Sequence, residues 1–272
     1  MQEPPRPVVV QQPPPPSLWD RVRVAPVTIV IAVVNLCVFL IAERWGSTLD
    51  TVTLLRFGAT ERTLVSLGEW WRIGTSMFLH IGWIHLLWNT YASFGWCAPV
   101  ERALGAPRFL TVYLLSGIGG GCASALCHEA VAAGASGACF GIIGATLVLV
   151  RRRASSWGTF FKLPGVRSTL VSAGIWTVIG VTMVNMDNFA HGGGFVTGVV
   201  VTAMVTSQRK VLRSPLLALP IAAALFVVGA RPWHKLSPDE IGFVAEYGEE
   251  LVKRGDTERG TSYIERAGRL AP

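Results

Sequence analysis

A serine, two histidines and an asparagine stand in stretches of this sequence that are otherwise apolar. Ser136 lies in the run GASG, His85 precedes Asn89 by four residues in HIGWIHLLWN, and His191 lies in NFAHGGGFVTG. A serine hydroxyl becomes a nucleophile when a neighbouring base accepts its proton. Histidine is the side chain best suited to that task near neutral pH. If the fold brings these residues together, the set predicts acyl-transfer chemistry.

Composition indicates what kind of fold must position them. The chain of 272 residues is 51% hydrophobic and only 15% charged, whereas a soluble domain carries about 25% charged residues. We therefore expect an all-α polytopic membrane protein. The cysteines have no metal-ligand spacing and are interpreted as small buried apolar residues, so no metal site is predicted. They are Cys37, Cys97, Cys122, Cys127 and Cys139.

Seven apolar stretches are long enough to suggest membrane spans, since a spanning helix needs roughly 20 apolar residues. Residues 44–74, between the first two stretches, are too polar to span and are interpreted as a loop half-embedded in the interface. The stretches are residues 25–43, 75–98, 109–127, 136–150, 168–186, 189–206 and 214–230.

The distribution of charge predicts the orientation. The loops after the second, fourth and sixth stretches contain ten basic residues and one acidic residue, Glu101. Basic residues accumulate in cytoplasmic loops, so the N-terminus is expected in the cytoplasm and the C-terminus outside. The net charge of +7 then reflects topology, and no nucleic-acid partner is expected. The basic residues are Arg102, Arg108, Arg151, Arg152, Arg153, Lys162, Arg167, Arg209, Lys210 and Arg213.

The two ends of the chain differ from the apolar middle. Residues 1–24 are rich in proline and are predicted to be a disordered cytoplasmic tail. Residues 207–230 are expected to form a cytoplasmic loop and the seventh span. Residues 231–272 have helical spacing in two pieces around Gly255 and are predicted to be a short extracytoplasmic helical tail. One helix-turn-helix unit cannot bury its own apolar face, so no function is assigned to it.

The predicted topology gathers the reactive residues at one depth. The second, fourth and sixth spans run in the same direction, so Ser136, His85, Asn89 and His191 all fall in the outer half of the membrane. No intramembrane Asp or Glu is placed to orient His191, which predicts a Ser–His dyad. Phe140, one turn beyond Ser136, is expected to pack against the histidine ring.

Small residues permit the helices to approach. Gly137, Gly141 and Ala145 form a stripe on the fourth span, and Gly194 and Gly198 form another on the sixth. Such stripes let helix backbones pack closely in membranes. This packing would bring the serine within reach of the histidine.

Each reactive residue also has a structural interpretation when it is taken alone. Ser136 can be a packing residue, His191 a donor between helices, and Asn89 a polar contact between helices. Taken together at one depth, they favour catalysis. An oxyanion would then be stabilised by the side chains of His85 and Asn89 with the backbone N–H of Ser136.

These motifs resemble the rhomboid family of intramembrane serine proteases. The matching segments are Trp71-Arg72, HIGWIHLLWN, GASGACFG and AHGGGFVTG, in the family's order, and the resemblance covers about residues 25–206. It implies a six-helix core over those residues, followed here by a seventh C-terminal transmembrane helix.

The resemblance also implies roles for individual residues. Ser136 would be the nucleophile and His191 the general base and acid, with His85, Asn89 and the Ser136 N–H in the oxyanion hole. His80 matches a further histidine near the site. Phe140 stands where the family often has a tyrosine; it keeps the aromatic ring but lacks the hydroxyl group that could form a hydrogen bond.

The implied activity is cleavage of single-pass transmembrane proteins within or near their membrane span, in the lipid bilayer, without a metal or organic cofactor. We expect a multi-pass protein of a bacterial inner membrane. One alternative is a non-catalytic rhomboid-like protein that binds transmembrane helices. A transporter with a polar midplane site is a further alternative, which the lack of internal repeats disfavours.

Overall fold

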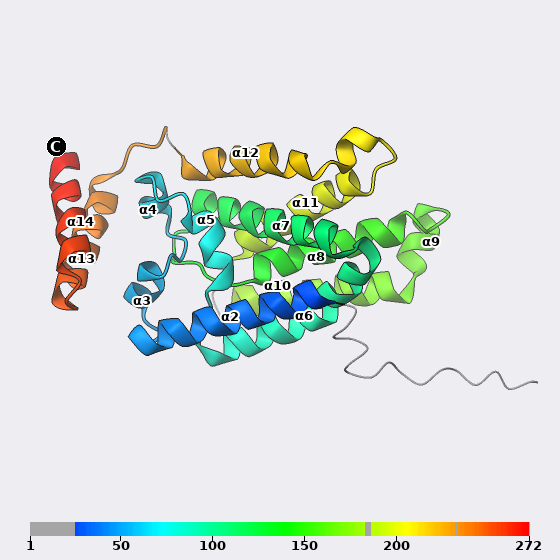
Figure 1. Cartoon of the computed structure of the whole chain (residues 1–272), viewed down its shortest axis with the longest axis horizontal. Helices are drawn as coiled ribbons and strands as arrows, with labels where there is room; N and C mark the ends of the chain where they lie inside the picture. The colour runs from blue at the N-terminus through cyan, green and yellow to red at the C-terminus, as the bar shows by residue number, and fades with distance from the viewer. Residues whose placement is uncertain (1–24, 183–185, 232, 272) are drawn as a thin grey trace, which may run out of the picture.

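The computed structural model describes residues 25–182, 186–231 and 233–271, and these residues form helices and one isolated bridge pair (Figure 1). The predicted proline-rich tail, residues 1–24, lies outside the described residues. The all-α fold class is confirmed for the part of the chain that the structure describes.

Long helices form a bundle in which the axes run roughly along one direction (Figure 1). Three of the described helices, α2, α7 and α11, are long and apolar enough to cross a membrane, and α8 and α12 are shorter apolar helices. Each long helix matches one of the seven apolar stretches. The helices are α2 (Pro26–Trp45), α6 (Gly82–Leu104), α7 (Ala106–Cys127), α8 (Ser136–Arg151), α10 (Pro164–Thr182), α11 (Asn188–Val205) and α12 (Ala218–Ala230).

The second span begins later than the sequence predicted. Instead of one helix from residue 75, the chain forms α5 (Arg72–Thr75) and the 3-10 helix η1 (Ser76–Phe78) before α6 starts at Gly82. Extended backbone at Leu79 (φ −90°, ψ 153°) and a positive φ of 69° at Gly82 interrupt the helix. His80 therefore lies in the connection before α6 and not within the span.

The predicted loop between the second and third spans is also absent from the described structure. Only Gly105, with a φ of 79°, separates α6 from α7. Glu101 lies in the last turn of α6 and is buried, where its carboxylate accepts hydrogen bonds from the backbone N–H groups of Val27 and Thr28, both at 2.8 Å. This acidic residue thus caps the N-terminus of α2, where free N–H groups favour negative charge.

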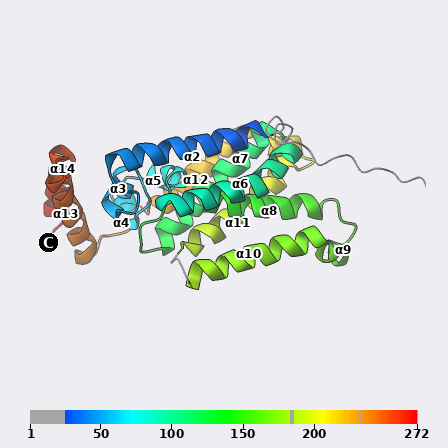
Figure 2. The ribbon, with the colours of Figure 1, turned by 90° about the horizontal axis from the view of Figure 1, so that it is seen from below.

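The bundle has two distinct ends, on which Figures 1 and 2 agree. The end called here the loop end carries α3 (Thr51–Arg56), α4 (Arg62–Ser66), α5 and residues 128–135. The opposite end, the α9 end, carries α9 (Trp157–Lys162) and the connection from α11 to α12, which includes η2 (Lys210–Arg213) and η3 (Pro215–Leu217). The basic residues that the sequence analysis placed in three loops lie toward the α9 end, at the α6–α7 junction, around α9 and between α11 and α12.

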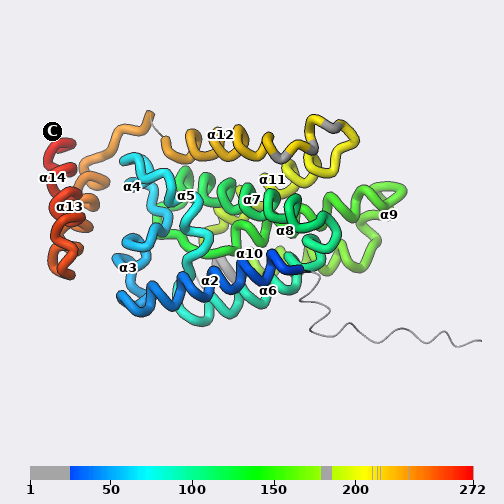
Figure 3. The backbone as a smooth tube through the Cα atoms, viewed as in Figure 1, coloured from blue at the N-terminus to red at the C-terminus, as the bar shows by residue number. Residues whose placement is uncertain are grey.

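The C-terminal residues form a helical hairpin across the loop end (Figure 3). It consists of α13 (Pro238–Lys253) and α14 (Thr257–Leu270), with Gly255 in the turn at a φ of 86°. The apolar face of the hairpin is buried against the α3–α4 segment, which supplies the partner that the sequence interpretation did not foresee. We call this contact the hairpin–loop cluster; its buried members are Leu55, Leu64, Leu67, Val244, Tyr247, Leu251, Tyr263 and Ala267.

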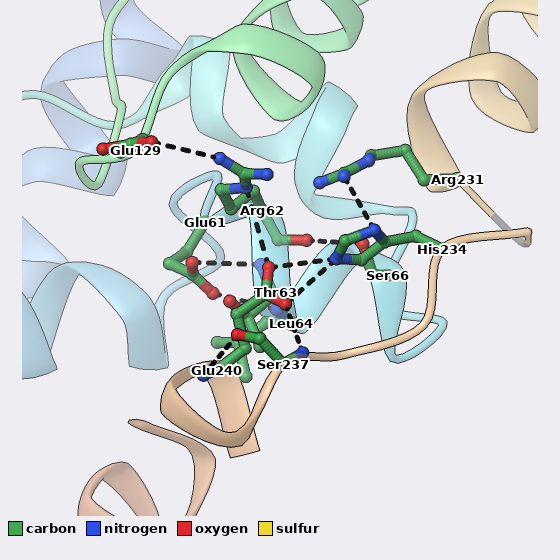
Figure 4. Close-up of polar contacts among 10 residues, drawn as sticks. All are labelled: Glu61, Arg62, Thr63, Leu64, Ser66, Glu129, Arg231, His234, Ser237 and Glu240. Atoms are coloured by element: carbon green, nitrogen blue, oxygen red, sulfur yellow. Dashed lines mark hydrogen bonds and ion pairs between the residues drawn. The ribbon is translucent and has the colours of Figure 1, made fainter. Parts of the chain in front are cut away.

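Polar contacts attach the start of the hairpin to the loop end (Figure 4). His234 Nε2 lies 3.0 Å from each carboxylate oxygen of Glu240, and Arg231 Nη2 donates to His234 Nδ1 at 2.9 Å. Arg62 of α4 forms two ion pairs: its Nε lies 3.8 Å from Glu240 Oε1, and its Nη1 lies 3.5 Å from Glu129 Oε1. The network therefore joins the linker after α12, the first turn of α13, α4 and the chain segment before α8.

Acidification is expected to loosen this attachment. Burial raises the pKa of Glu240, but hydrogen bonds from the Ser237 backbone and His234 outweigh it and hold the pKa below 4.5. A carboxyl with a depressed pKa contributes stability above its unfolded pKa and loses it as pH falls through the folded pKa. Hydrogen exchange in α13 and α14, corrected for intrinsic rates, should therefore speed up between about pH 5 and pH 3. Glu240→Gln should reduce this pH dependence; an unchanged dependence in the variant would contradict the assignment.

Candidate active site

Ser136 and His191 meet at the loop end of the bundle, although they come from different helices. Ser136 is the first residue of α8, and His191 lies in the first turn of α11. The Ser136 Oγ and His191 Nε2 atoms are 2.9 Å apart, which is hydrogen-bonding distance. The His191 side chain is buried, with 3% of its surface exposed. A serine hydroxyl can therefore pass its proton directly to this ring nitrogen.

Phe140 fixes the plane of the histidine ring. Its ring lies one turn beyond Ser136 and stacks on His191 with the centroids 4.2 Å apart and an interplanar angle of 6°. A phenyl ring has no polar atom, so it orients the imidazole by packing alone. Among the described residues, His191 Nδ1 has no hydrogen-bond partner.

Asp187 stands one turn before His191 and was missed in the sequence. Its Oδ1 accepts a hydrogen bond from Ala190 N at 2.9 Å and caps α11. His128, at the end of α7, places Nδ1 3.9 Å from the same carboxylate. The available signal was the position of the aspartate just before an apolar helical stretch, which is typical of an N-cap.

His85 lines the same cavity as Ser136. The backbone N–H of Ile81 donates to His85 Nδ1 at 3.2 Å, which places the proton of the neutral ring on Nε2. Gly134, with a φ of 138°, lies beside the ring, and a Cβ there would be 2.7 Å from His85 Cε1. Glycine is therefore required at this turn. His80 is buried next to His85, with the ring centroids 5.4 Å apart.

Asn89 lies one turn after His85 and is also buried, with 4% of its surface exposed. Its Nδ2 donates one hydrogen bond to His85 O at 3.0 Å, and an amide nitrogen carries a second N–H. A small pocket touches Asn89, Phe140, Ser136 and His191 together. The second N–H can therefore serve a group bound at the serine.

Glycine contacts set the distance between α8 and α11. A Cβ on Gly194 would collide with the carbonyl oxygen of Gly137, and one on Gly198 would collide with that of Gly141. The two backbones thus touch at the positions of the small-residue stripes. This close approach accounts for the short separation between the side chains of Ser136 and His191.

A cavity of about 940 Å³ opens at these residues. The charged residues on its described wall are Glu43 and Asp187, and no Lys or Arg contributes to that wall. A search of the described residues finds no cluster of three or more His, Cys, Asp or Glu suited to a metal ion. The wall includes His85, Gly134, Ser136 and His191 together with the indole rings of Trp88 and Trp176.

Comparison with known proteins places the chain in a family. The family model described as a Rhomboid domain matches residues 67–208. Over 239 residues the chain is 35% identical to the Rhomboid protease GluP of Bacillus subtilis, covering 86% of this chain and 45% of that protein.

Two further relatives extend the comparison. RHOMBOID-like protein 5 of Arabidopsis thaliana is 34% identical over 149 residues, covering 54% of this chain and 47% of that protein. The Rhomboid protease AarA of Providencia stuartii is 28% identical over 225 residues, covering 74% of this chain and 80% of that protein. The chain thus spans about half the length of GluP and of the plant protein. With a matching domain, an all-α bundle and apolar helices long enough to cross a bilayer, the chain belongs to the rhomboid family and is an integral, multi-pass membrane protein.

Proposed function

We propose that this protein is an intramembrane serine endopeptidase that cleaves single-pass transmembrane proteins within or near their membrane span. The observation that carries the proposal is the pair formed by Ser136 Oγ and His191 Nε2 at 2.9 Å, beside a large cavity. Two relatives are themselves named rhomboid proteases, GluP and AarA. No metal or organic cofactor is part of the proposal.

The first step forms an acyl-enzyme. His191 Nε2 accepts the proton of Ser136 Oγ as the oxygen bonds to the carbonyl carbon of the scissile peptide. The carbonyl oxygen becomes a tetrahedral oxyanion. The same nitrogen then gives its proton to the leaving amide nitrogen as the C–N bond breaks, so the amine product departs neutral.

Three donors are placed to stabilise the oxyanion. They are the Nε2–H of His85, the second amide N–H of Asn89 and the backbone N–H of Ser136. The last is free because the first N–H groups of a helix have no intrahelical acceptor. Donors that are already oriented before charge develops are a large source of rate enhancement.

Water completes the reaction. In the second step His191 Nε2 takes a proton from a water molecule, whose oxygen attacks the ester carbonyl, and returns a proton to Ser136 Oγ as the acid product leaves. Hydrolysis at membrane depth requires space for this water, and polar backbone and side chains at such depth are tolerated where they line a cavity. The 940 Å³ cavity at Ser136 supplies that space.

The proposed orientation follows from charge. The basic residues lie toward the α9 end, and basic residues favour the cytoplasmic side. The N-terminus is therefore assigned to the cytoplasm, and the loop end, with the cavity and the C-terminal hairpin, to the outside. A bacterial inner membrane is the proposed location.

A cleavage assay with defined products tests this function. Purified protein in detergent is incubated with a tagged single-pass protein, and the new termini are identified by mass spectrometry. The proposal predicts a cut within or next to the spanning segment that disappears in Ser136→Ala. Binding of the substrate without any cut, in wild type and variant alike, would instead support a non-catalytic helix-binding protein.

Removal of one oxyanion donor should impair the enzyme without abolishing its activity. Asn89→Ala deletes one of three donors, and loss of one such donor typically costs on the order of 10²–10³ in turnover. Measured kcat should fall by that factor while the protein keeps its thermal stability. If Asn89→Ala unfolds the protein, or matches Ser136→Ala in total loss of activity, Asn89 is a structural residue.

A further inference from the structure

The hairpin formed by α13 and α14 lies apart from α8 and α11, and the sequence alone assigns it no function. Its contacts lead by two routes from the C-terminus to the segment that precedes Ser136. We propose that the hairpin is a positioning element of the active site, which holds residues 128–135 and thereby fixes Gly134 and Ser136 beside His85. The expected effect on kcat rests on the proposed function, whereas the expected effect on the segment 128–135 does not.

The first route starts at a buried ion pair. Tyr263 Oη donates to Glu69 Oε1 at 2.5 Å, and the other oxygen of Glu69 lies 2.6 Å from both Nε and Nη2 of Arg72. Arg72 and Glu69 have 1% and 6% of their surfaces exposed. Burial, together with the hydrogen bond to Glu69, raises the pKa of Tyr263 to about 12, so the phenol remains a donor at neutral pH. The hairpin thus supplies a hydrogen bond to a buried carboxylate.

Arg72 connects this ion pair to the backbone of the segment between α3 and α4. Its Nη1 donates to Leu55 O at 2.6 Å and to Ala59 O at 3.0 Å, and its own carbonyl oxygen accepts from Thr60 Oγ1 at 3.0 Å. One guanidinium therefore organises the turn that precedes Thr60. Each of the three guanidinium nitrogens of Arg72 thus has a partner, which restricts the movement of this buried side chain.

Thr60 is tied directly to the segment before the serine. Thr60 and Ala132 exchange two backbone hydrogen bonds of 2.9 Å and form the isolated bridge. Two residues later, Gly134 N donates to Ser76 O at 3.0 Å, with its Cα close to the ring of His85. Ser136 follows at the start of α8. Contacts therefore lead from Tyr263 to Ala132, and Ser136 follows four residues later in the sequence.

The second route starts from α13, whereas the first starts from α14. Arg62 of α4 pairs with Glu240 in the first turn of α13 and with Glu129 in the segment before α8 (Figure 4). Val131, two residues beyond Glu129, packs against the hairpin–loop cluster and also lines the cavity. The hairpin is thus linked to the segment 128–135 through Arg62 of α4 and through the apolar cluster against which Val131 packs.

These contacts matter because the segment 128–135 has few constraints of its own. It contains no helix, and its backbone conformation at Gly134 is left-handed with a φ of 138°. A displacement of about 1 Å in a reacting group can cost on the order of 10²-fold in rate. Holding the segment from outside the membrane-spanning helices preserves the separation of the reactive atoms without crowding the cavity.

The substitution Tyr263→Phe tests this role with the smallest change. It removes the hydrogen bond to Glu69 and keeps the ring in the hairpin–loop cluster. Glu265→Gln on the same helix is the matched control, because Glu265 is exposed and forms an ion pair with Arg269 of the same helix. Both variants are made in the full chain.

Two measurements are compared with wild type. Hydrogen exchange of residues 128–135 should speed up in Tyr263→Phe and stay unchanged in Glu265→Gln. The kcat for a tagged transmembrane substrate should fall roughly 3- to 30-fold in Tyr263→Phe, with KM unchanged, because coupling through such networks spans that range. Adding Glu129→Gln, which breaks the second route, should enlarge both effects.

The outcomes separate this inference from the proposed function. If Tyr263→Phe loosens the hairpin but leaves exchange in 128–135 and kcat at wild-type values, the positioning role is wrong while the protease assignment stands. If the wild type does not cleave but exchange in 128–135 responds as described, the protease assignment fails and the coupling stands. Should Tyr263→Phe be too unstable to purify, Glu129→Gln alone gives the same two readouts.

Discussion

Ser136→Ala and His191→Asn are each expected to eliminate cleavage, with a loss on the order of 10⁴-fold or more in kcat. The serine variant lacks the oxygen that forms the acyl bond, and the histidine variant lacks the base that accepts its proton at 2.9 Å. Neither variant alters the glycine contacts at Gly137–Gly194 and Gly141–Gly198 that set the distance between α8 and α11. Initial rates with a fluorogenic transmembrane substrate, at saturating concentration, measure the effect.

The double variant makes this prediction sharper. Groups that act as one unit lose activity non-additively, so Ser136→Ala combined with His191→Asn should be no slower than either single variant. Phe140→Leu, which removes the stacked ring, serves as a comparison and should reduce kcat by a smaller factor. Substantial activity in His191→Asn would show that Ser136, if it reacts, uses another base.

Gly198→Ala is expected to have the second large effect, on folding as well as activity. A Cβ at this position collides with the backbone of Gly141 on α8, and a backbone atom cannot move aside as a flexible side chain can. Overpacking costs about 1–3 kcal/mol and shifts the elements apart. Because α8 carries Ser136 and α11 carries His191, the dyad should separate and cleavage should fall together with the thermal unfolding midpoint.

Gly192→Ala is the matched control on the same helix. A Cβ at Gly192 meets no atom within 4 Å, and replacing a helical glycine by alanine is favourable by about 1 kcal/mol when space permits. The two alanines should therefore shift the unfolding midpoint in opposite directions. A lowered midpoint in both variants would mean that helix propensity or lipid contact, and not the α8–α11 contact, determines the outcome.

Much of the fold was predictable because hydropathy and charge act locally. The seven apolar stretches correspond to α2, α6, α7, α8, α10, α11 and α12, and the separation of basic loops from the reactive residues follows the predicted alternation. The predicted start of the second span was wrong, because a hydropathy pattern carries no information about backbone dihedral angles. The positive φ of Gly82 and the extended Leu79 remove His80 from the helix.

The close approach of the helices that carry the candidate site residues was also predictable. Small residues at helical spacing implied close backbones, and the structure has Gly194 against Gly137 and Gly198 against Gly141. Asp187 was missed because an aspartate that caps a helix and one that lies beside a candidate catalytic histidine look alike in sequence. The sequence cannot show whether its carboxylate faces the backbone or the ring.

The C-terminal hairpin could not have been placed from the sequence. Its helical spacing was visible, but its partner, the α3–α4 segment, lies almost two hundred residues earlier, as the bond between Tyr263 and Glu69 illustrates. Neither segment has a sequence pattern that identifies the other as its contact partner. Long-range contacts of this kind depend on the whole bundle being folded.

Covalent labelling of the wild-type protein gives the most direct evidence for an activated serine. The protein is treated with a fluorophosphonate, which reacts with serine hydroxyls that a base has activated, and the modified peptide is identified by mass spectrometry. We predict a single modification on Ser136, lost in Ser136→Ala and strongly slowed in His191→Asn. Labelling of Ser136 at the same rate in His191→Asn, or modification at another serine in wild type, would contradict the Ser136–His191 dyad.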